Sequence, residues 1–204
     1  MQEVQEIQEV FVSNPDSARQ PRADAQKNRE RLLEAALALF TGSKDEVTLS
    51  AVAERAGVGI GTLYRHFPTR DALVEAVYRS EVQRLSDAAP RLLQKMPAEA
   101  ALEEWLRRYS ALIVAKRGLK EALQSIFEPG SETSAYSRDR ITAAVTLLLD
   151  AAVNSGAIRG DADPQDVLMA VAGSTWFFAG DKDWKERAGR VIGLVMDGLR
   201  YRPR

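Results

Sequence analysis

The chain has 204 residues, 45% of them hydrophobic and 28% charged, and it carries a formal net charge of −1. It contains no cysteine and one histidine, which excludes disulfides, zinc–thiolate sites, thiol nucleophiles and catalytic triads centred on histidine. A near-neutral chain also does not fit a protein that coats DNA without selectivity. We therefore expect no metal site, no cofactor and no enzymatic activity.

The N-terminal residues 1–22 predict a flexible arm, because they are polar and rich in turn formers. The alternative is a short docking helix, since Val4, Ile7, Val10 and Phe11 have a weak helical spacing. The arm lacks the basic region and long apolar core of a secretory signal. No later run approaches the ~20 apolar residues of a transmembrane helix. We expect a cytoplasmic protein with no membrane partner.

A basic cluster lies at the start of the first predicted helix and is interrupted only by Asp24 and Glu30. Its members are Arg19, Arg22, Lys27, Arg29 and Arg31. A DNA phosphate backbone could pass along this cluster. The alternative is an ordinary solvated helix start. A local basic patch on a near-neutral chain favours selective binding over coating.

The first helix is predicted to begin near Ala25, with a buried stripe at Leu32, Ala36, Leu39 and Phe40. Residues 48–67, TLSAVAERAGVGIGTLYRHF, then predict two short helices joined by a tight turn. Thr48 can cap the first of these by accepting a bond from a free backbone N–H. Gly57 can end it, because glycine adopts positive φ without strain. Pro68 stops the second helix, so the segment has the helix-turn-helix form that places one helix in a major groove.

The second helix of this segment has two sides when its residues are placed at about 100° intervals. Leu63 and Phe67 share the side that packs inward, and Ile60 lies at the edge of that side. Gly61, Thr62 and Arg65 point outward, flanked by Tyr64 and His66. An arginine, a threonine, two polar aromatics and a glycine that permits close approach suit contact with a major groove.

The remaining segments also predict helices, about nine in all, and no convincing strand or internal repeat is present. Thr69 caps a helix that runs past Leu85, and Pro90 and Pro97 bracket an uncertain stretch. Later helices are expected over about 98–116, over 119–127, after the polar loop 128–134, over 164–179 and up to Leu199, the last capped by Asp181 or Asp183. The predicted fold class is all-α.

The last two helices predict a dimer interface. The segment VLMAVAGSTWFF (167–178) is apolar nearly all round, so more than one of its sides must be covered. Gly189 and Gly193, one turn apart in the final helix, would let another helix approach closely. A four-helix bundle with two helices from each subunit accounts for both features. Burial within a single chain is the alternative.

Two segments, RLLEAALALF (31–40) and TLSAVAERAGVGIGTLYRHFPTRDALVEAVY (48–78), resemble the N-terminal domain of the TetR family of bacterial transcriptional repressors. The resemblance covers about residues 27–85, and the rest of the chain resembles the family in length and helical pattern only. It implies a helix-turn-helix DNA-binding domain at 23–70, followed by a helical ligand-binding and dimerisation domain at 71–204. Members of this family pair through their last two helices.

The same resemblance implies roles for individual residues. Thr48, Tyr64, His66 and Arg70 would anchor phosphates, whereas Ile60, Gly61, Thr62 and Arg65 would face base edges or adjacent backbone. Ile60 stands where the family often has lysine or serine, and it can touch a thymine methyl but cannot donate a hydrogen bond. The alternatives are that Thr48 only caps and Tyr64 only packs.

Six large side chains are candidates for an apolar effector pocket: Trp105, Tyr109, Phe127, Met169, Trp176 and Phe177. Helical spacing alone favours plain core for each of them, and the pocket itself is implied by the family resemblance. The resulting hypothesis is a homodimeric repressor that a small apolar ligand releases from a palindromic DNA operator.

Two other classes of protein stay open as alternatives. One is a helical enzyme that uses carboxylates, although no apolar helix face pairs two carboxylates with a second catalytic group. The other is a scaffold that has lost DNA binding, against which the intact Tyr64, Arg65 and Arg70 argue.

Overall fold

The computed structural model describes residues 15–42, 47–119, 123 and 131–201. This part of the chain contains eight helices and no strand, which confirms the predicted all-α class. The helices are α1 (Pro15–Gly42), α2 (Leu49–Ala56), α3 (Ile60–His66), α4 (Arg70–Leu93), α5 (Ala98–Gly118), α7 (Glu132–Asn154), α8 (Pro164–Phe178) and α9 (Trp184–Arg200). The segment expected to be helical over 119–127 lies mostly outside the described residues.

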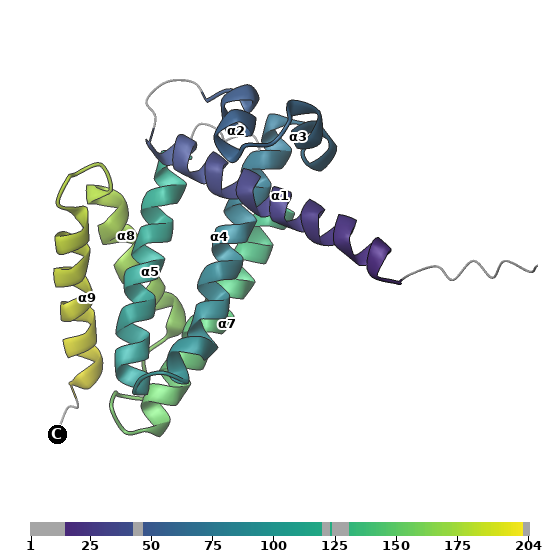
Figure 1. Ribbon diagram of the computed structural model, residues 1–204. Helices are drawn as coiled ribbons and strands as arrows, with labels where there is room; N and C mark the ends of the chain where they lie inside the picture. Colours follow the sequence, from purple (N-terminus) through teal and green to yellow (C-terminus); the bar gives the residue numbers. More distant parts are fainter. Residues whose placement is uncertain (1–14, 43–46, 120–122, 124–130, 202–204) are drawn as a thin grey trace, which may run out of the picture.

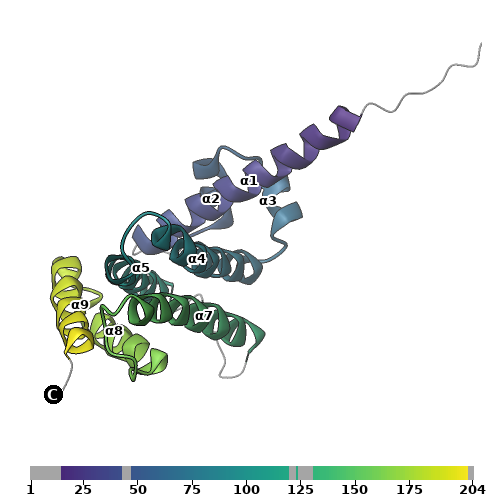
Figure 2. The ribbon, with the colours of Figure 1, turned by 90° about the horizontal axis from the view of Figure 1, so that it is seen from below.

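Helices α1–α3 gather at one end of the molecule, and α4 runs from that end into the helical bundle (Figure 1). Helix α4 packs against α7 and α5, while α8 and α9 pack on the other side of α5. The view from below shows α8 and α9 at the edge farthest from the N-terminal part of α1 (Figure 2). Helix α4 therefore connects the α1–α3 end directly to the interior of the bundle.

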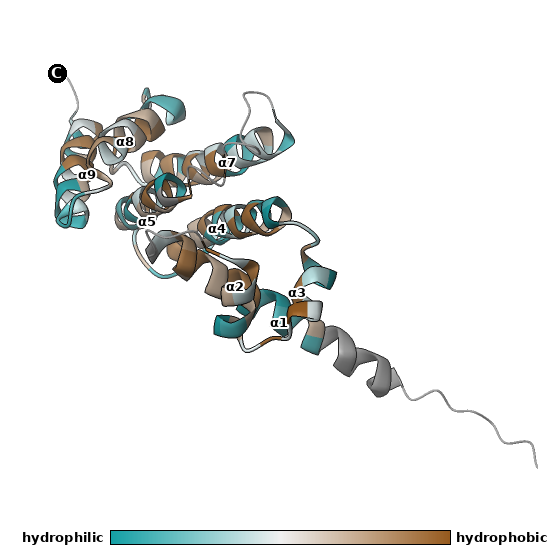
Figure 3. Cartoon of the chain, turned by 90° about the horizontal axis from the view of Figure 1, so that it is seen from above, coloured by the Kyte–Doolittle hydropathy of each residue, from teal (hydrophilic) through white to brown (hydrophobic). Residues whose placement is uncertain are grey.

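The bundle interior is aliphatic and aromatic. Leu102 and Leu106 of α5 and Leu148 of α7 are fully buried, and Trp105 is buried with its Nε1 donating to the Leu85 carbonyl at 2.9 Å. This bond satisfies the one polar atom of the indole, which would otherwise be costly to bury. Figure 3 shows that hydrophobic residues also appear on α8 and α9.

Several helix ends differ from the sequence prediction. Helix α1 already begins at Pro15, so residues 15–22, expected in the flexible arm, are helical. Helix α4 runs past Leu85 as expected and continues through Pro90 to Leu93, into the stretch that the sequence left uncertain. Helix α7 begins at Glu132, inside the loop expected over 128–134, since the Ser131 hydroxyl accepts from the Ser134 N–H at 3.3 Å.

The start of α9 differs as well. Asp183 occupies the cap position but makes no side-chain capping bond. The Asp181 carboxylate, the other expected cap, instead accepts a hydrogen bond from Arg187. None of the described helices is both long enough and apolar enough to cross a membrane.

Candidate DNA-binding interface

The turn between α2 and α3 depends on one glycine. Gly57 has φ of 61° and ψ of 40°, in the left-handed region that penalises any residue with a Cβ. The Thr48 hydroxyl caps the other end of α2 by accepting from the Ala51 N–H at 3.2 Å. Both assignments made from the sequence are confirmed, because local cap and turn chemistry determines them.

Helix α3 has a buried side and an exposed side, but two residues differ from the expectation: Ile60, expected at the edge of the inward side, is exposed, and Thr62, expected to point outward, is half-buried. Leu63 is fully buried and Phe67, which ends the helix, is 3% exposed. On the other side Ile60 is 42% exposed and Tyr64 is 50% exposed, and Arg65 also faces solvent. Gly61 is open as well, since a Cβ built there would meet no atom within 4 Å outside the backbone of its own helix. The outward side of α3 is therefore uncovered by the described residues.

The remaining predicted residues lie at the margins of this surface. Thr62 and His66 are half-buried, and the His66 ring is tilted against Phe67 at a centroid distance of 6.1 Å. Arg70 is the first residue of α4, with its guanidinium 5.5 Å from the centre of the Phe40 ring. The Nε of Arg70 is buried and has no hydrogen-bond partner among the described residues. Thr69 caps α4, and its hydroxyl accepts from the Ala72 N–H at 3.1 Å.

Two members of the basic cluster have contacts within the protein that the sequence interpretation missed. The Arg31 Nη2 donates to the Gly57 carbonyl at 3.1 Å, and the Arg29 guanidinium lies 5.5 Å from the centre of the Phe67 ring. Both side chains therefore hold the helix-turn-helix segment against α1. A signal for Arg29 existed, because it lies three residues before the buried Leu32 and continues the inward stripe of α1.

The five candidate pocket residues that the structure describes are not brought together. Trp105 and Tyr109 stack inside the bundle with ring centroids 5.7 Å apart, whereas Met169 and Phe177 on α8 are 69% and 82% exposed. Trp176 is also exposed, and its carbonyl accepts from the Arg117 Nη1 at 2.7 Å. Phe127 lies outside the described residues.

Helices α8 and α9 share an exposed apolar surface, which we call the α8/α9 face. It comprises Met169, Gly173 and Phe177 of α8 with Leu194 and Gly198 of α9. Gly189 lies elsewhere, because a Cβ there would meet the Arg107 Nη1 of α5 at 2.9 Å. Of the two glycines proposed from the sequence to admit a partner helix, Gly189 thus faces α5 of its own chain, while Gly193 has open space.

Comparison with known proteins agrees with this architecture at both ends of the chain. The family model of bacterial regulatory proteins of the TetR family matches residues 32–77. The model of the C-terminal domain of SbtR-like transcriptional regulators matches residues 97–201. The second match covers the helical part that resembled the family only in pattern.

Individual relatives support the same assignment. The transcriptional repressor KstR of Rhodococcus jostii is 30% identical over 152 residues, which is 74% of this chain and 68% of the relative. KstR of Mycolicibacterium smegmatis is 39% identical over 71 residues, about a third of each chain.

Solved structures give the same result. A TetR transcriptional regulator from Streptomyces coelicolor is 41% identical with a TM-score of 0.78, and the alignment covers 86% of this chain and 99% of that one. A TetR regulatory protein from Mycobacterium vanbaalenii is 35% identical with a TM-score of 0.71, over 89% of this chain and 99% of that one. An uncovered recognition helix, matched family models and relatives over most of the chain lead to one conclusion: this chain belongs to the TetR family and is a DNA-binding transcriptional regulator.

Proposed function

We propose that this regulator is a repressor that binds a palindromic operator as a homodimer and leaves it when a small apolar effector binds. The observation that carries the proposal is the uncovered side of α3, where Ile60, Gly61, Tyr64 and Arg65 face solvent. A surface that combines an exposed arginine with exposed apolar groups fits base edges in a major groove. The name of the R. jostii relative, a transcriptional repressor, supports repression over activation.

The side chains of the interface fall into two groups, those that would contact base edges and those that would contact phosphates. Arg65 is the candidate for bidentate contact with a guanine, because its guanidinium is exposed. Its Nε donates a hydrogen bond to the Gly61 carbonyl of the same helix at 3.3 Å, which leaves the terminal nitrogens available. Ile60 and Thr62 are candidates for thymine methyl groups and adjacent backbone. Thr48, Tyr64, His66 and Arg70 would anchor phosphates and so fix the register of the helix. Gly61 would let the backbone of α3 approach the groove.

We place the boundary between the DNA-binding and effector domains at residues 70 and 71, where α4 begins. The effector would lie among the helices of the bundle, against the stacked Trp105 and Tyr109. Met169 and Phe177 fit the dimer interface better than the pocket, because their side chains lie on the outside of the bundle. An effector reduces operator occupancy only through different affinity for two conformations, and a hundredfold change needs about 2.7 kcal/mol of coupling.

A binding experiment tests the central claim. The preferred duplex is selected from a random pool, and its Kd is measured for the wild type and for Arg65→Ala. We expect the variant to bind the preferred site about tenfold or more weakly, with reduced discrimination at one base pair, because a bidentate contact is lost. Arg91→Ala is the matched control, since Arg91 is exposed at the far end of α4.

The salt dependence of the same complex supplies a second criterion. The logarithm of the binding constant should fall steeply with the logarithm of salt concentration, with a slope of about −0.9 per phosphate neutralised. Wild-type selection that yields no preferred duplex, or an Arg65→Ala variant that binds it as tightly as the wild type, would contradict the proposed role of α3.

A further inference from the structure

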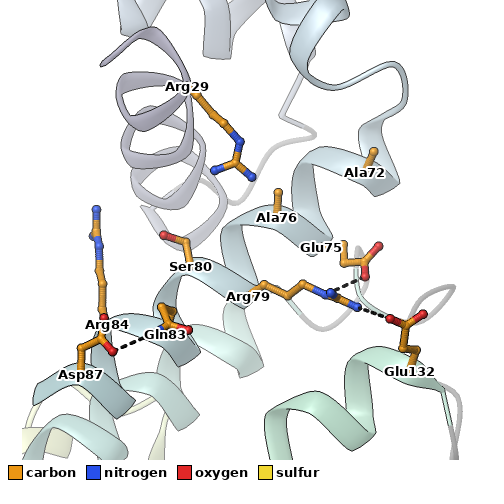
Figure 4. A pocket seen from close by; sticks show the side chains of 10 residues that line it. All are labelled: Arg29, Ala72, Glu75, Ala76, Arg79, Ser80, Gln83, Arg84, Asp87 and Glu132. Carbon is orange, nitrogen blue, oxygen red and sulfur yellow. Dashed lines mark hydrogen bonds and ion pairs between the residues drawn. The ribbon is translucent and has the colours of Figure 1, made fainter. Parts of the chain in front are cut away.

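A cavity of about 660 Å³ lies between α1, α4 and the start of α7 (Figure 4). Its volume falls within the range of about 300–1,000 Å³ that small-molecule sites occupy. It is separate from the aromatic interior of the bundle, because its walls come from α1, from the outer side of α4 and from Glu132. The proposed function makes no use of this cavity.

The wall of the cavity on α4 is made of small side chains. Ala72, Ala76 and Ser80 follow one another at intervals of four residues and so form a ledge along one side of α4. Figure 4 shows that Arg29 points from α1 toward this ledge, near Ala76. The Ser80 hydroxyl has no hydrogen-bond partner among the described residues, so it is available to a bound molecule.

Three guanidinium groups line the cavity, and two of them have carboxylate partners. Arg79 lies 3.0 Å from Glu75 and 3.8 Å from Glu132, and Arg84 lies 3.1 Å from Glu81 and 3.4 Å from Glu34. The third, Arg29, makes no ion pair and no hydrogen bond with the part of the chain that the structure describes. The lining also holds three carboxylates, of Glu75, Asp87 and Glu132, and the Asp87 carboxylate accepts a hydrogen bond from the neutral Gln83 amide at 2.6 Å. Arg29 is therefore the one guanidinium of the lining that has no carboxylate partner among the described residues.

The contact between Arg29 and Phe67 leaves the N–H donors of the guanidinium free of partners in the described part of the chain. Its guanidinium lies 5.5 Å from the centre of the Phe67 ring, which engages the planar group through attraction between cation and π-system. A guanidinium carries five N–H donors in its plane, arranged to bind a carboxylate or a phosphate through two parallel hydrogen bonds. Because Arg29 is half-buried, such a bond would form in a partly desolvated setting and would be stronger than one at the open surface.

We propose that this cavity binds a small organic anion, with its carboxylate or phosphate group on Arg29 and Ser80 and its carbon skeleton along Ala72 and Ala76. The ligand would join α1, which braces the end of the recognition helix, to the connecting helix α4. This site goes beyond the proposed function, and its test uses ligand binding without DNA. Failure of either proposal therefore leaves the other intact.

Benzoate and phenyl phosphate serve as probes, and benzamide serves as the neutral analogue of benzoate. Calorimetric titration of the full chain at constant ionic strength should give a Kd of about 1 mM or tighter for at least one anion. Benzamide should bind at least about tenfold more weakly, because it lacks the charge that Arg29 pairs with. The ratio of the two anion affinities shows whether the site prefers carboxylate or phosphate.

Two variants test the location of the site. Arg29→Met keeps an apolar side chain on Phe67 but removes the donors, and Ala76→Leu fills the cavity without changing any charge. Each substitution should weaken the binding of the anion at least about tenfold. The matched controls are Arg91→Met and Ala100→Leu, both at exposed positions away from the cavity, and thermal melting checks that every variant folds.

The proposal is supported if the wild type, the two controls and Arg65→Ala all bind the anion while Arg29→Met and Ala76→Leu bind it weakly. Arg65→Ala is included because anions can also gather on the recognition surface. The proposal is overturned if neither anion binds the wild type, if benzamide binds as well as benzoate, or if folded Arg29→Met and Ala76→Leu bind like the wild type.

Discussion

Three arginines near the helix-turn-helix differ in what their positions allow. Arg65 faces solvent from α3, Arg31 is held on the carbonyl of Gly57, and Arg29 lies against the Phe67 ring. Charge alone would assign all three to DNA phosphates. The bond from Arg31 to the Gly57 carbonyl holds that side chain against the turn, whereas the bond from Arg65 to the Gly61 carbonyl stays within α3 and leaves the guanidinium on the outward side.

Tyr109 connects a single buried residue to the pH dependence of stability. Burial, with a smaller effect from the nearby Tyr78, raises the pKa of Tyr109 from 10.0 to about 12. The unfolded chain therefore ionises first, so the stability present below pH 10 is lost as the pH rises toward 12. At about pH 11 this loss amounts to about 1.4 kcal/mol.

Between about pH 8 and pH 11 the ionisation of Tyr109 should lower the unfolding free energy of the wild type by about 1.4 kcal/mol. We expect the Tyr109→Phe variant to lack this part of the loss. Urea denaturation at both pH values measures the difference. Tyr201→Phe is the control, because Tyr201 is exposed beyond the end of α9 and should behave like the wild type. Parallel losses in Tyr109→Phe and the wild type would show that Tyr109 ionises equally in the folded chain.

At the scale of the element, α2 and α3 are short, and their stability depends on the residues that cap them. Isolated helices of eight and seven residues would not be stable, because nucleation is costly and few internal bonds follow. The Thr48 cap, the left-handed Gly57 and the buried Leu63 hold them together. The outward side of α3 contributes little to this stability, so folding and DNA contact can be separated by mutation.

Gly57→Ala and Gly61→Ala form a matched pair that tests this separation. Gly57→Ala should lower the unfolding free energy by about 1–2 kcal/mol, because a Cβ at positive φ is strained and would also approach Arg31. Gly61→Ala should leave stability unchanged or higher, since its Cβ meets open space and alanine favours helix. Its methyl group should nevertheless weaken operator binding, because it occupies the side that faces the groove.

Thermal melting and operator titration, applied to both variants, measure the two effects. A stable Gly57→Ala variant would show that the turn does not need the left-handed conformation. A Gly61→Ala variant with wild-type operator affinity would show that the backbone of α3 does not approach the bases closely.

At the scale of the whole molecule, the α8/α9 face is the surface best suited to a second copy of the chain. Met169, Leu194 and Phe177 are 69%, 72% and 82% exposed, and Gly173 and Gly198 lie beside them without obstructing side chains. Pairing through this face would form a four-helix bundle around a two-fold axis. A dimer would present two α3 helices to half-sites about 34–36 Å apart.

Phe177→Glu should turn the dimer into a monomer, because pairing through the α8/α9 face would bury the new charge. Light scattering coupled to gel filtration measures the mass, and operator titration should show a loss of about a hundredfold or more, since the two half-sites are then bound independently. Ala100→Glu adds the same charge at an exposed position of α5 and should have neither effect. A dimeric Phe177→Glu variant would place the interface elsewhere.

Local chemistry in the sequence was enough to predict most of the fold and the outward side of α3. The caps at Thr48 and Thr69, the turn at Gly57 and the stop at Pro68 act within a few residues, so their effects could be inferred without the tertiary structure. Apolar periodicity likewise marked the inward stripes of the long helices. The start of α1 was missed, because residues 15–22 contain turn-forming residues that the helix nevertheless accommodates.

Only the tertiary structure decided which long side chains meet. Spacing along α8 places Met169 and Phe177 on one side of that helix, but whether that side faces the bundle or the outside depends on how α8 packs against α5 and α9. In the same way, the arrangement of α1 against α4 turns Arg29 toward a cavity, and the packing of α1 against α2 places Arg31 beside the Gly57 carbonyl. A sequence pattern specifies the sides of each helix, whereas contacts between helices depend on packing among residues far apart in the chain.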